Sequence, residues 1–112
     1  MSEHWDGLSV QWLCWRAQLL SRNGFVHRGL VYQLVAYHMQ PEDTEVLHGL
    51  AKLFASSGDG ERALAVIKKM EEKDVNEKQL SVLRVNAYRA MGRLQEARGL
   101  LVTQTDEPKA EQ

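Results

Sequence analysis

The side chains that could act as nucleophiles or metal ligands are one cysteine, Cys14, and four histidines, His4, His27, His38 and His48. A cysteine nucleophile needs a neighbouring base and a lowered pKa, and although His4 is near in sequence, no triad-like order is present. No two histidines have the i, i+4 spacing that places two ligands on one helix face, and one cysteine does not make a zinc site. We therefore expect a buried structural cysteine, structural or surface histidines, no catalytic residues, no metal and no cofactor.

Two further segments could suggest chemistry. The stretch Gly58-Asp59-Gly60-Glu61-Arg62 is rich in glycine, but it lacks the lysine and the serine or threonine of a phosphate-binding loop. Residues 68–74 carry charges of both signs at helical spacing, which is typical of a solvated helix face. We interpret the first as a turn between two helices and the second as surface, so neither predicts an enzyme.

Composition narrows the possible functions further. The 112 residues are one domain's worth, with 14 basic and 15 acidic side chains and a net charge of −1, whereas a binder of duplex nucleic acid usually carries a basic excess. No apolar run approaches the roughly 18 residues of a membrane span, and the N-terminus does not read as a secretory signal. A single cysteine cannot form an internal disulfide, which suggests a reducing, intracellular setting.

A 34-residue repeat is the strongest pattern in the chain. Gly24, Gly58 and Gly92 recur at this interval. Five residues after each glycine stands a small residue, and four residues before it stands a large apolar one: Gly29, Ala63 and Ala97, and Leu20, Phe54 and Tyr88. Each glycine can end a helix in the left-handed conformation, and each small residue lets the next helix approach closely.

The repeat predicts an all-α chain. We expect helices over 9–22, 26–39, 43–56, 61–73, 77–90 and 94–104. Asp43 or Thr44 is expected to cap the third helix and Asp59 the fourth. Two apolar stripes indicate buried helix faces: Leu47, Leu50, Ala51 and Phe54 on the third helix, and Leu94, Ala97, Leu100 and Leu101 on the last.

The period and these positions resemble the tetratricopeptide (TPR) family over roughly residues 10–111. The resemblance implies a right-handed α-solenoid of three helical hairpins, with units at about 10–43, 44–77 and 78–111 in a single domain of residues 1–104. The polar residues 105–112 are expected to form a flexible tail. The chain departs from the family at a position that often holds tryptophan, where Leu13, Leu47 and Ser81 stand.

In this family the first helix of each pair lines a concave groove that binds a peptide or a short helix. Carried over position by position, the resemblance implies these partner-binding residues: Cys14, Trp15, Gln18, His48, Gly49, Lys52, Val82, Leu83, Asn86 and Arg89. Gly49 would leave a hollow walled by Trp15 and Leu83. We expect this hollow to receive an apolar side chain of a partner, the alternative being that Trp15 is core and Gly49 allows close helix packing.

The C-terminal helix suggests a second contact. No further helix follows 94–104 to cover Leu100, Leu101 and Val102. We expect these side chains to be partly exposed, so the chain could form a dimer or a heterodimer through this helix.

Three-unit TPR proteins with little else resemble the small chaperones of type III secretion systems, and this chain looks most similar to the Y-type export chaperones. Needle-subunit chaperones are similar in size and repeat content. The resemblance implies a cytoplasmic protein that holds a small secreted protein before export and presents it to the export gate. The alternatives are a generic TPR scaffold and a helical-repeat RNA reader; residues 65–73 loosely resemble a pentatricopeptide unit, but the near-neutral charge argues against RNA.

Overall fold

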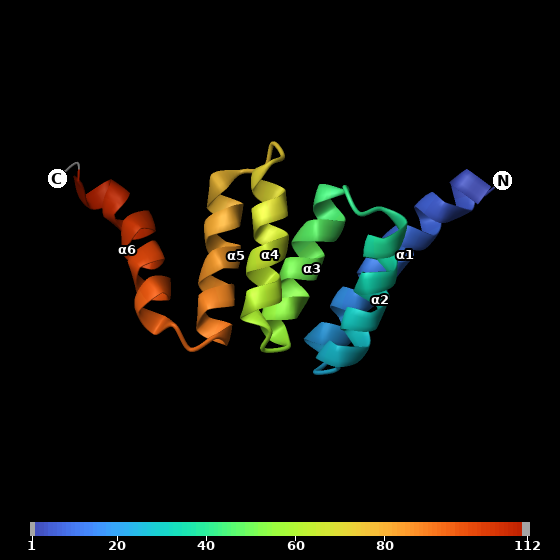
Figure 1. The fold of residues 1–112 in the computed structure, drawn as a ribbon, viewed down its shortest axis with the longest axis horizontal. Helices are drawn as coiled ribbons and strands as arrows, with labels where there is room; N and C mark the ends of the chain where they lie inside the picture. Colours follow the sequence, from blue (N-terminus) through green and yellow to red (C-terminus); the bar gives the residue numbers. More distant parts are fainter. Residues whose placement is uncertain (1, 111–112) are drawn as a thin grey trace.

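The computed structural model describes the backbone of residues 2–110 and the side chains of residues 9–102. This part of the chain is all-helical and contains no strand. The helices are α1 Ser2–Arg22, α2 Val26–Met39, α3 Thr44–Ser56, α4 Gly60–Glu71, α5 Glu77–Ala90 and α6 Leu94–Ala110. They follow one another side by side along an elongated body of 57 × 28 × 21 Å, with the termini at opposite ends (Figure 1).

The predicted helices are all present, and the main differences lie at the two ends of the chain. Helix α1 begins at Ser2, seven residues before the predicted start. Helix α6 continues through Ala110, past the predicted end at residue 104. The mobility of residues 105–112 stays a prediction.

The three repeat glycines form the same turn. Gly24, Gly58 and Gly92 have φ of +89°, +88° and +74°, the left-handed region that glycine adopts without a steric penalty. At each turn the glycine N–H donates to the carbonyl three residues back, at 3.0 Å. The next N–H donates to the carbonyl five residues back, at 2.8 Å. This is the Schellman pattern that ends a helix, so the 34-residue period is a period of helix C-termini.

Side-chain caps begin the helices where the sequence predicts them. The Asp43 carboxylate accepts from the N–H groups of Glu45 and Val46, at 2.8 and 3.2 Å, and so caps α3. Asp59 accepts from the N–H of Arg62 at 3.1 Å and caps α4. Both caps satisfy N–H groups that have no partner inside the helix, which confirms the predicted caps. The interpretation of residues 58–62 as a turn is correct only for Gly58 and Asp59, because α4 already begins at Gly60.

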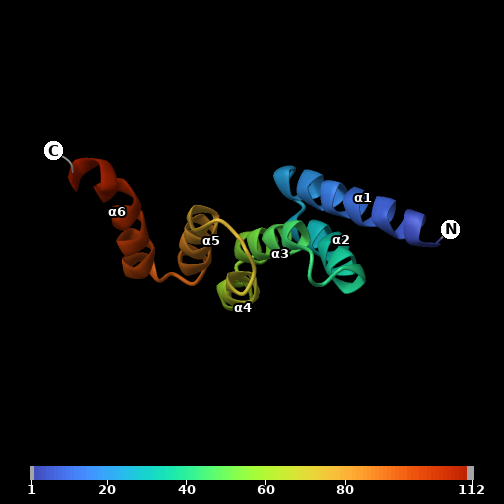
Figure 2. The ribbon, with the colours of Figure 1, turned by 90° about the horizontal axis from the view of Figure 1, so that it is seen from above.

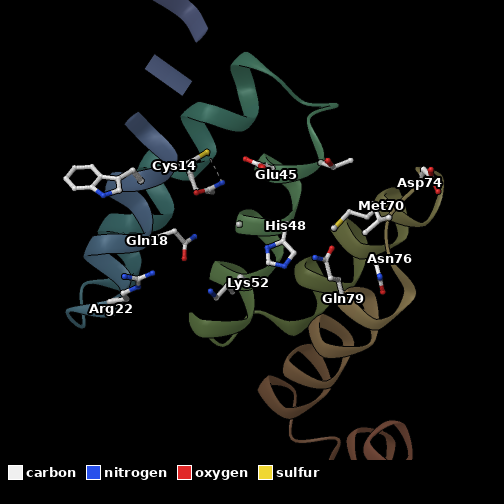
Figure 3. A pocket seen from close by; sticks show the side chains of 15 residues that line it. Cys14, Gln18, Arg22, Glu45, His48, Lys52, Met70, Asp74, Asn76 and Gln79 are labelled. Atoms are coloured by element: carbon white, nitrogen blue, oxygen red, sulfur yellow. Dashed lines mark hydrogen bonds between the residues drawn. The ribbon is translucent and has the colours of Figure 1, made fainter. Parts of the chain in front are cut away.

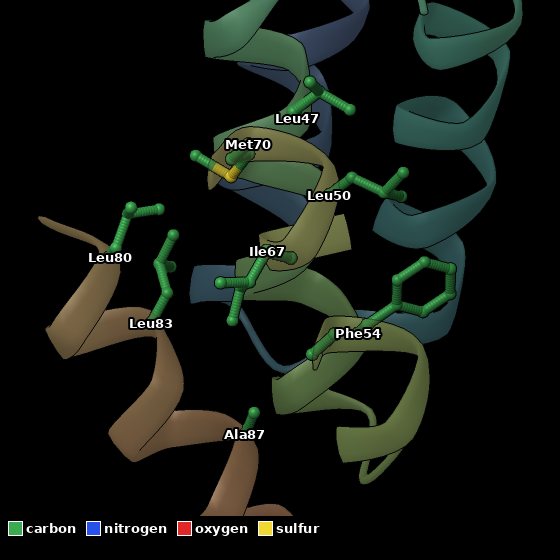
Figure 4. Close-up of a cluster of buried hydrophobic side chains, with 10 residues drawn as sticks. Leu47, Leu50, Phe54, Ile67, Met70, Leu80, Leu83 and Ala87 are labelled. Carbon is green, nitrogen blue, oxygen red and sulfur yellow. The ribbon is translucent and has the colours of Figure 1, made fainter. Parts of the chain in front are cut away.

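An apolar cluster holds α3, α4 and α5 together (Figure 4). All four residues of the predicted α3 stripe are buried in it. The cluster, called the central core below, contains no polar side chain and is made of Leu47, Leu50, Ala51, Phe54, Ala63, Ile67, Met70, Leu80, Leu83 and Ala87. The periodicity of the third predicted helix therefore found the buried face.

Two glycines allow helices to pack closely. A Cβ on Gly29 would lie 2.6 Å from the Ala17 carbonyl oxygen of α1, which explains the small residue predicted there. A Cβ on Gly60 would overlap the Ala87 carbonyl oxygen of α5 and the Met91 side chain. The approach of α4 to α5 at Gly60 was not predicted, because this glycine was interpreted only as part of a turn.

The apolar stripe predicted for the last helix is largely wrong. Ala97 is buried, but Leu94 is 59% exposed and Leu101 46% exposed. Among the described residues, α6 contacts only α5, so this one neighbour covers only a narrow part of it. Val102 is also exposed, as expected for the end of the array, and Leu100 is partly buried.

The helices α1, α3 and α5 lie next to one another. Each helix contacts its neighbour in the chain, and in addition α1 contacts α3 and α3 contacts α5. Seen from above, α3 lies between α1 and α5, with α4 below it (Figure 2). Helices α1, α3 and α5 therefore share one face of the molecule.

Candidate functional site

A groove of about 690 Å³ opens on the face shared by α1, α3 and the start of α5. Figure 3 shows side chains of α1 on one side, those of α3 along the floor, and those of the α4–α5 turn on the other side. This groove is lined by Cys14, Trp15, Gln18, Arg22, Gln33, Thr44, Glu45, His48, Gly49, Lys52, Met70, Asp74, Val75, Asn76 and Gln79. A smaller hollow of about 400 Å³ continues from Lys52 toward α5 and is lined by Lys52, Ala55, Ser56, Asn86, Arg89 and Ala90.

Most of the predicted partner-binding residues lie on these two surfaces. The groove contains Cys14, Trp15, Gln18, His48, Gly49 and Lys52. The second hollow contains Lys52, Asn86 and Arg89. Trp15 is 57% exposed, so it is not a core residue. Whether these side chains bind a partner stays a prediction.

Two of the predicted residues lie elsewhere. Leu83 is 3% exposed and belongs to the central core, so it cannot wall a hollow on the surface. Val82 is 52% exposed but lines neither the groove nor the second hollow. Of the residues carried over to α5, Asn86 and Arg89 line the second hollow, whereas Leu83 packs among residues of α3 and α4.

The hollow predicted at Gly49 is filled by the protein itself. A Cβ on Gly49 would lie 2.7 Å from Nε2 of Gln33, whose amide crosses over the glycine. Gly49 therefore makes room for a side chain of α2, and the predicted pocket for a partner's apolar side chain is wrong. Close packing was the alternative interpretation of this glycine.

Gln33 joins three helices beneath the groove. Its side chain is fully buried. Nε2 donates to the Val46 carbonyl of α3 at 3.0 Å and to Sγ of Cys14 on α1 at 3.5 Å. Oε1 is buried without a hydrogen-bond partner. An unpaired buried acceptor costs about 1–3 kcal/mol, so the amide is a polar and imperfectly satisfied link between α1, α2 and α3. We call Cys14, Gln33, Val46 and Gly49 the Gln33 seam.

The surroundings of Cys14, which is only partly buried, disfavour its thiolate form. Burial raises the pKa of the Cys14 thiol above its ordinary value. The Gln33 hydrogen bond opposes this shift in pKa, and the carboxylates of Asp43 and Glu45 reinforce it. Since the thiolate is the reactive form, these surroundings favour a structural role for Cys14.

His48 lies in the middle of the groove floor (Figure 3). Burial lowers its pKa below the ordinary value, and the nearby Lys52 ammonium lowers the pKa further, while Glu45 opposes the shift. A neutral imidazole has one N–H donor and one nitrogen acceptor. Near neutral pH, the groove floor therefore offers a partner a hydrogen-bonding group without charge.

Sequence reasoning missed several residues of the groove. Arg22 and Asp74 lie outside the family's usual groove positions, and Met70 belongs to a second helix of the repeat. The sequence does indicate Gln33, since a glutamine within the largely apolar segment 26–39 suggests a buried polar contact.

The described part of the chain has neither a cluster of metal ligands nor a helix that could span a membrane. Within it, no group of three or more His, Cys, Asp or Glu side chains is arranged to hold a metal ion. No helix there is both long enough and apolar enough to cross a membrane. The side chain of His4 lies outside the described residues.

Comparisons with known proteins do not assign the chain. No family model, curated protein or solved structure matches it. The function must therefore be inferred from the residues and from their arrangement.

Proposed function

We propose that this chain is a protein-binding adaptor, built as a right-handed α-solenoid of three TPR-like hairpins, whose groove holds a segment of another protein. The observation that carries the proposal is the open groove across α1, α3 and the start of α5, with the exposed indole of Trp15 on its rim. Exposed aromatic side chains beside polar ones are typical of surfaces that bind proteins.

The repeated turn supports the finer architecture. Three identical Schellman turns at 34-residue intervals are what three pairs of antiparallel helices, joined in the same way, would have. Contacts from α1 to α3 and from α3 to α5 are those expected when such pairs stack. A stack of this kind presents the first helices on one face, where the groove lies.

The resemblance to small type III secretion chaperones gives the proposal its biological form. In that form the chain is a cytoplasmic chaperone that holds a small secreted protein until export, with the Y-type export chaperones favoured and the needle-subunit chaperones as the second subtype. Burying an aggregation-prone segment in the groove would lower its free concentration and keep the partner in solution.

A photo-crosslinking experiment tests this function. A photoreactive amino acid is placed at Gln18, inside the groove, and at Ala65, an exposed position of α4 that lines neither hollow. In the native host, we expect the Gln18 variant to crosslink to a small protein and the Ala65 variant to give at least tenfold less of the same product. The captured protein, expressed alone, should aggregate and should become soluble when co-expressed with this chain.

Three results would contradict the proposal in different ways. Equal crosslinking at both positions would remove the groove as the binding site. A captured partner that is soluble by itself would favour a generic scaffold over a chaperone. Crosslinking to RNA instead of protein would favour the helical-repeat RNA reader.

A further inference from the structure

The charged residues of the groove are sorted by sign. Arg22 and Lys52 lie at one end, and Glu45 and Asp74 lie at the other, with Gln18, His48 and Gln79 between them (Figure 3). The second hollow extends the basic end, because it shares Lys52 and adds Arg89. We call Arg22, Lys52 and Arg89 the basic corner; its members come from α1, α3 and α5, the three helices that share this face.

The charged side chains that face the groove take part in no ion pair with another described residue. Among the described residues, the ion pairs join Lys69 and Lys73 to Glu42, Arg84 to Glu71 and Glu77, Arg62 to Asp59, and Arg93 to Glu96. None of these residues lines the groove or the second hollow. The charges that face the groove are therefore available to a bound molecule.

Helix dipoles explain only part of this arrangement. A cation in the last turn of a helix gains about 0.3–1 kcal/mol from the dipole, which accounts for Arg22 on α1 and Arg89 on α5. Lys52 lies before the last turn of α3, which has no basic residue. Lys52 is also the residue common to both hollows, so the central member of the basic corner has no role in capping its helix.

We propose that the groove selects a partner segment with a cluster of acidic side chains, and that this cluster binds at the basic corner, away from Glu45 and Asp74. This inference rests on the proposed function, since it specifies the chemistry of the segment that the groove holds. Unpaired cations from three helices attract carboxylates over several ångströms, and the acidic end of the groove repels them. The sign of the charge thus fixes which end of the segment lies near the Gly24 and Gly58 turns.

Two probe peptides and two variants test the assignment. A labelled hexaglutamate peptide and a labelled hexalysine peptide are titrated against the full chain at low salt, with fluorescence anisotropy as the readout. We expect hexaglutamate to bind at least tenfold more tightly than hexalysine and its affinity to fall as salt is added. Lys52→Glu should weaken hexaglutamate binding at least tenfold.

Lys68→Glu is the matched control, because Lys68 is exposed on α4, lines neither hollow and undergoes the same change of charge. It should change the affinity less than twofold. Equal losses in both variants would mean that the peptide senses only net charge, and absence of hexaglutamate binding would mean that no acidic site exists; either result overturns the proposal. A protein crosslinked at Gln18 whose bound segment lacks acidic residues would also overturn it, while leaving the proposed function intact.

Discussion

The two sides of α3 are held in contrasting ways. Toward α4 and α5, α3 contributes Leu47, Leu50 and Phe54 to the central core, which contains no polar side chain. Toward α1 and α2, the buried apolar cluster is small, with Val10, Ala36 and Val46, and a fully buried glutamine lies beside it. One wall of the groove therefore stands on an apolar core and the other on the Gln33 seam.

The two walls of the groove should therefore resist deformation in different ways. Apolar packing is non-directional, and its strength grows with the area removed from water. A buried amide instead stabilises only when its hydrogen bonds keep their geometry, and here one of its polar atoms already has no partner. We expect the α1 side of the groove to loosen before the α5 side, which would let the groove adapt its width to a bound segment.

The largest expected effect comes from the central core. Leu50 is 1% exposed, and Leu50→Ala should lower the free energy of unfolding by about 2–5 kcal/mol, because it removes buried methyl groups and leaves a cavity. Urea denaturation followed by circular dichroism measures this loss. Val31→Ala, at a residue that is 61% exposed on α2, should cost less than about 0.5 kcal/mol. Similar losses in both variants would contradict the assignment of the core.

A smaller change in unfolding free energy is expected from Gly49→Ala in the Gln33 seam, and its sign should depend on whether Gln33 is present. Gly49→Ala should push the Gln33 amide away from the Val46 carbonyl, at a cost of about 1–3 kcal/mol. The gain in helix propensity, about 1 kcal/mol, offsets part of this cost. In a Gln33→Ala background the clash is absent, so the same Gly49→Ala change should stabilise the protein. Denaturation of the four proteins of this double-mutant cycle measures both signs.

Hydrogen exchange locates the effect of Gly49→Ala. Amides of α1 and α2 should exchange faster, while those of α5 should be unchanged, because the described part of α5 contacts neither α1 nor α2. A uniform increase along the chain would show that the seam and the central core unfold as one unit. Destabilisation by Gly49→Ala in both backgrounds would contradict the role of Gln33.

This comparison also explains what the sequence could predict. Helix α3 has a clear apolar stripe, so its periodicity found the buried face. Helix α2 is apolar on nearly all sides, and it buries Gly29, Gln33 and Ala36 while exposing Val31, Leu34 and Val35. A hydrophobicity pattern selects the wrong face there, because close helix approach, rather than apolar area, determines which side turns inward.

The sequence likewise predicted some residues of the candidate site and not others. Positions carried over from the repeat found the groove residues of α1 and α3, whose register the repeat glycines fix. On α5 the same positions divide: Asn86 and Arg89 line the second hollow, whereas Val82 lines neither hollow. Leu83 is buried in the central core, because it packs in one cluster with Ile67 and Met70. The charge order of the groove was not predicted, since Arg22 and Asp74 are distant in sequence and line the same groove only in the fold.

The smallest expected effect is a dependence of stability on pH that arises from His48 on the groove floor. Because burial and Lys52 lower the pKa of His48 in the folded chain, the unfolded chain binds this proton more readily. The contribution of His48 to stability is therefore fully present above its ordinary pKa of 6.5 and is lost as the pH falls below that value. Charged groups near it on α3 are Lys52 and Glu45, and Arg22 and Asp74 face the same groove from α1 and the α4–α5 turn.

Urea denaturation at several pH values between 7.5 and 5, with His48→Gln and His38→Gln compared, measures the contribution. Replacing His48 should flatten the fall in unfolding free energy below pH 6.5, whereas replacing His38, which is exposed on α2, should not. An NMR titration adds a direct readout, because Lys52→Ala should raise the pKa of His48 and Glu45→Gln should lower it further. If both histidine variants keep the full slope, protonation of the groove floor does not weaken the fold, and the pH response must come from elsewhere in the chain.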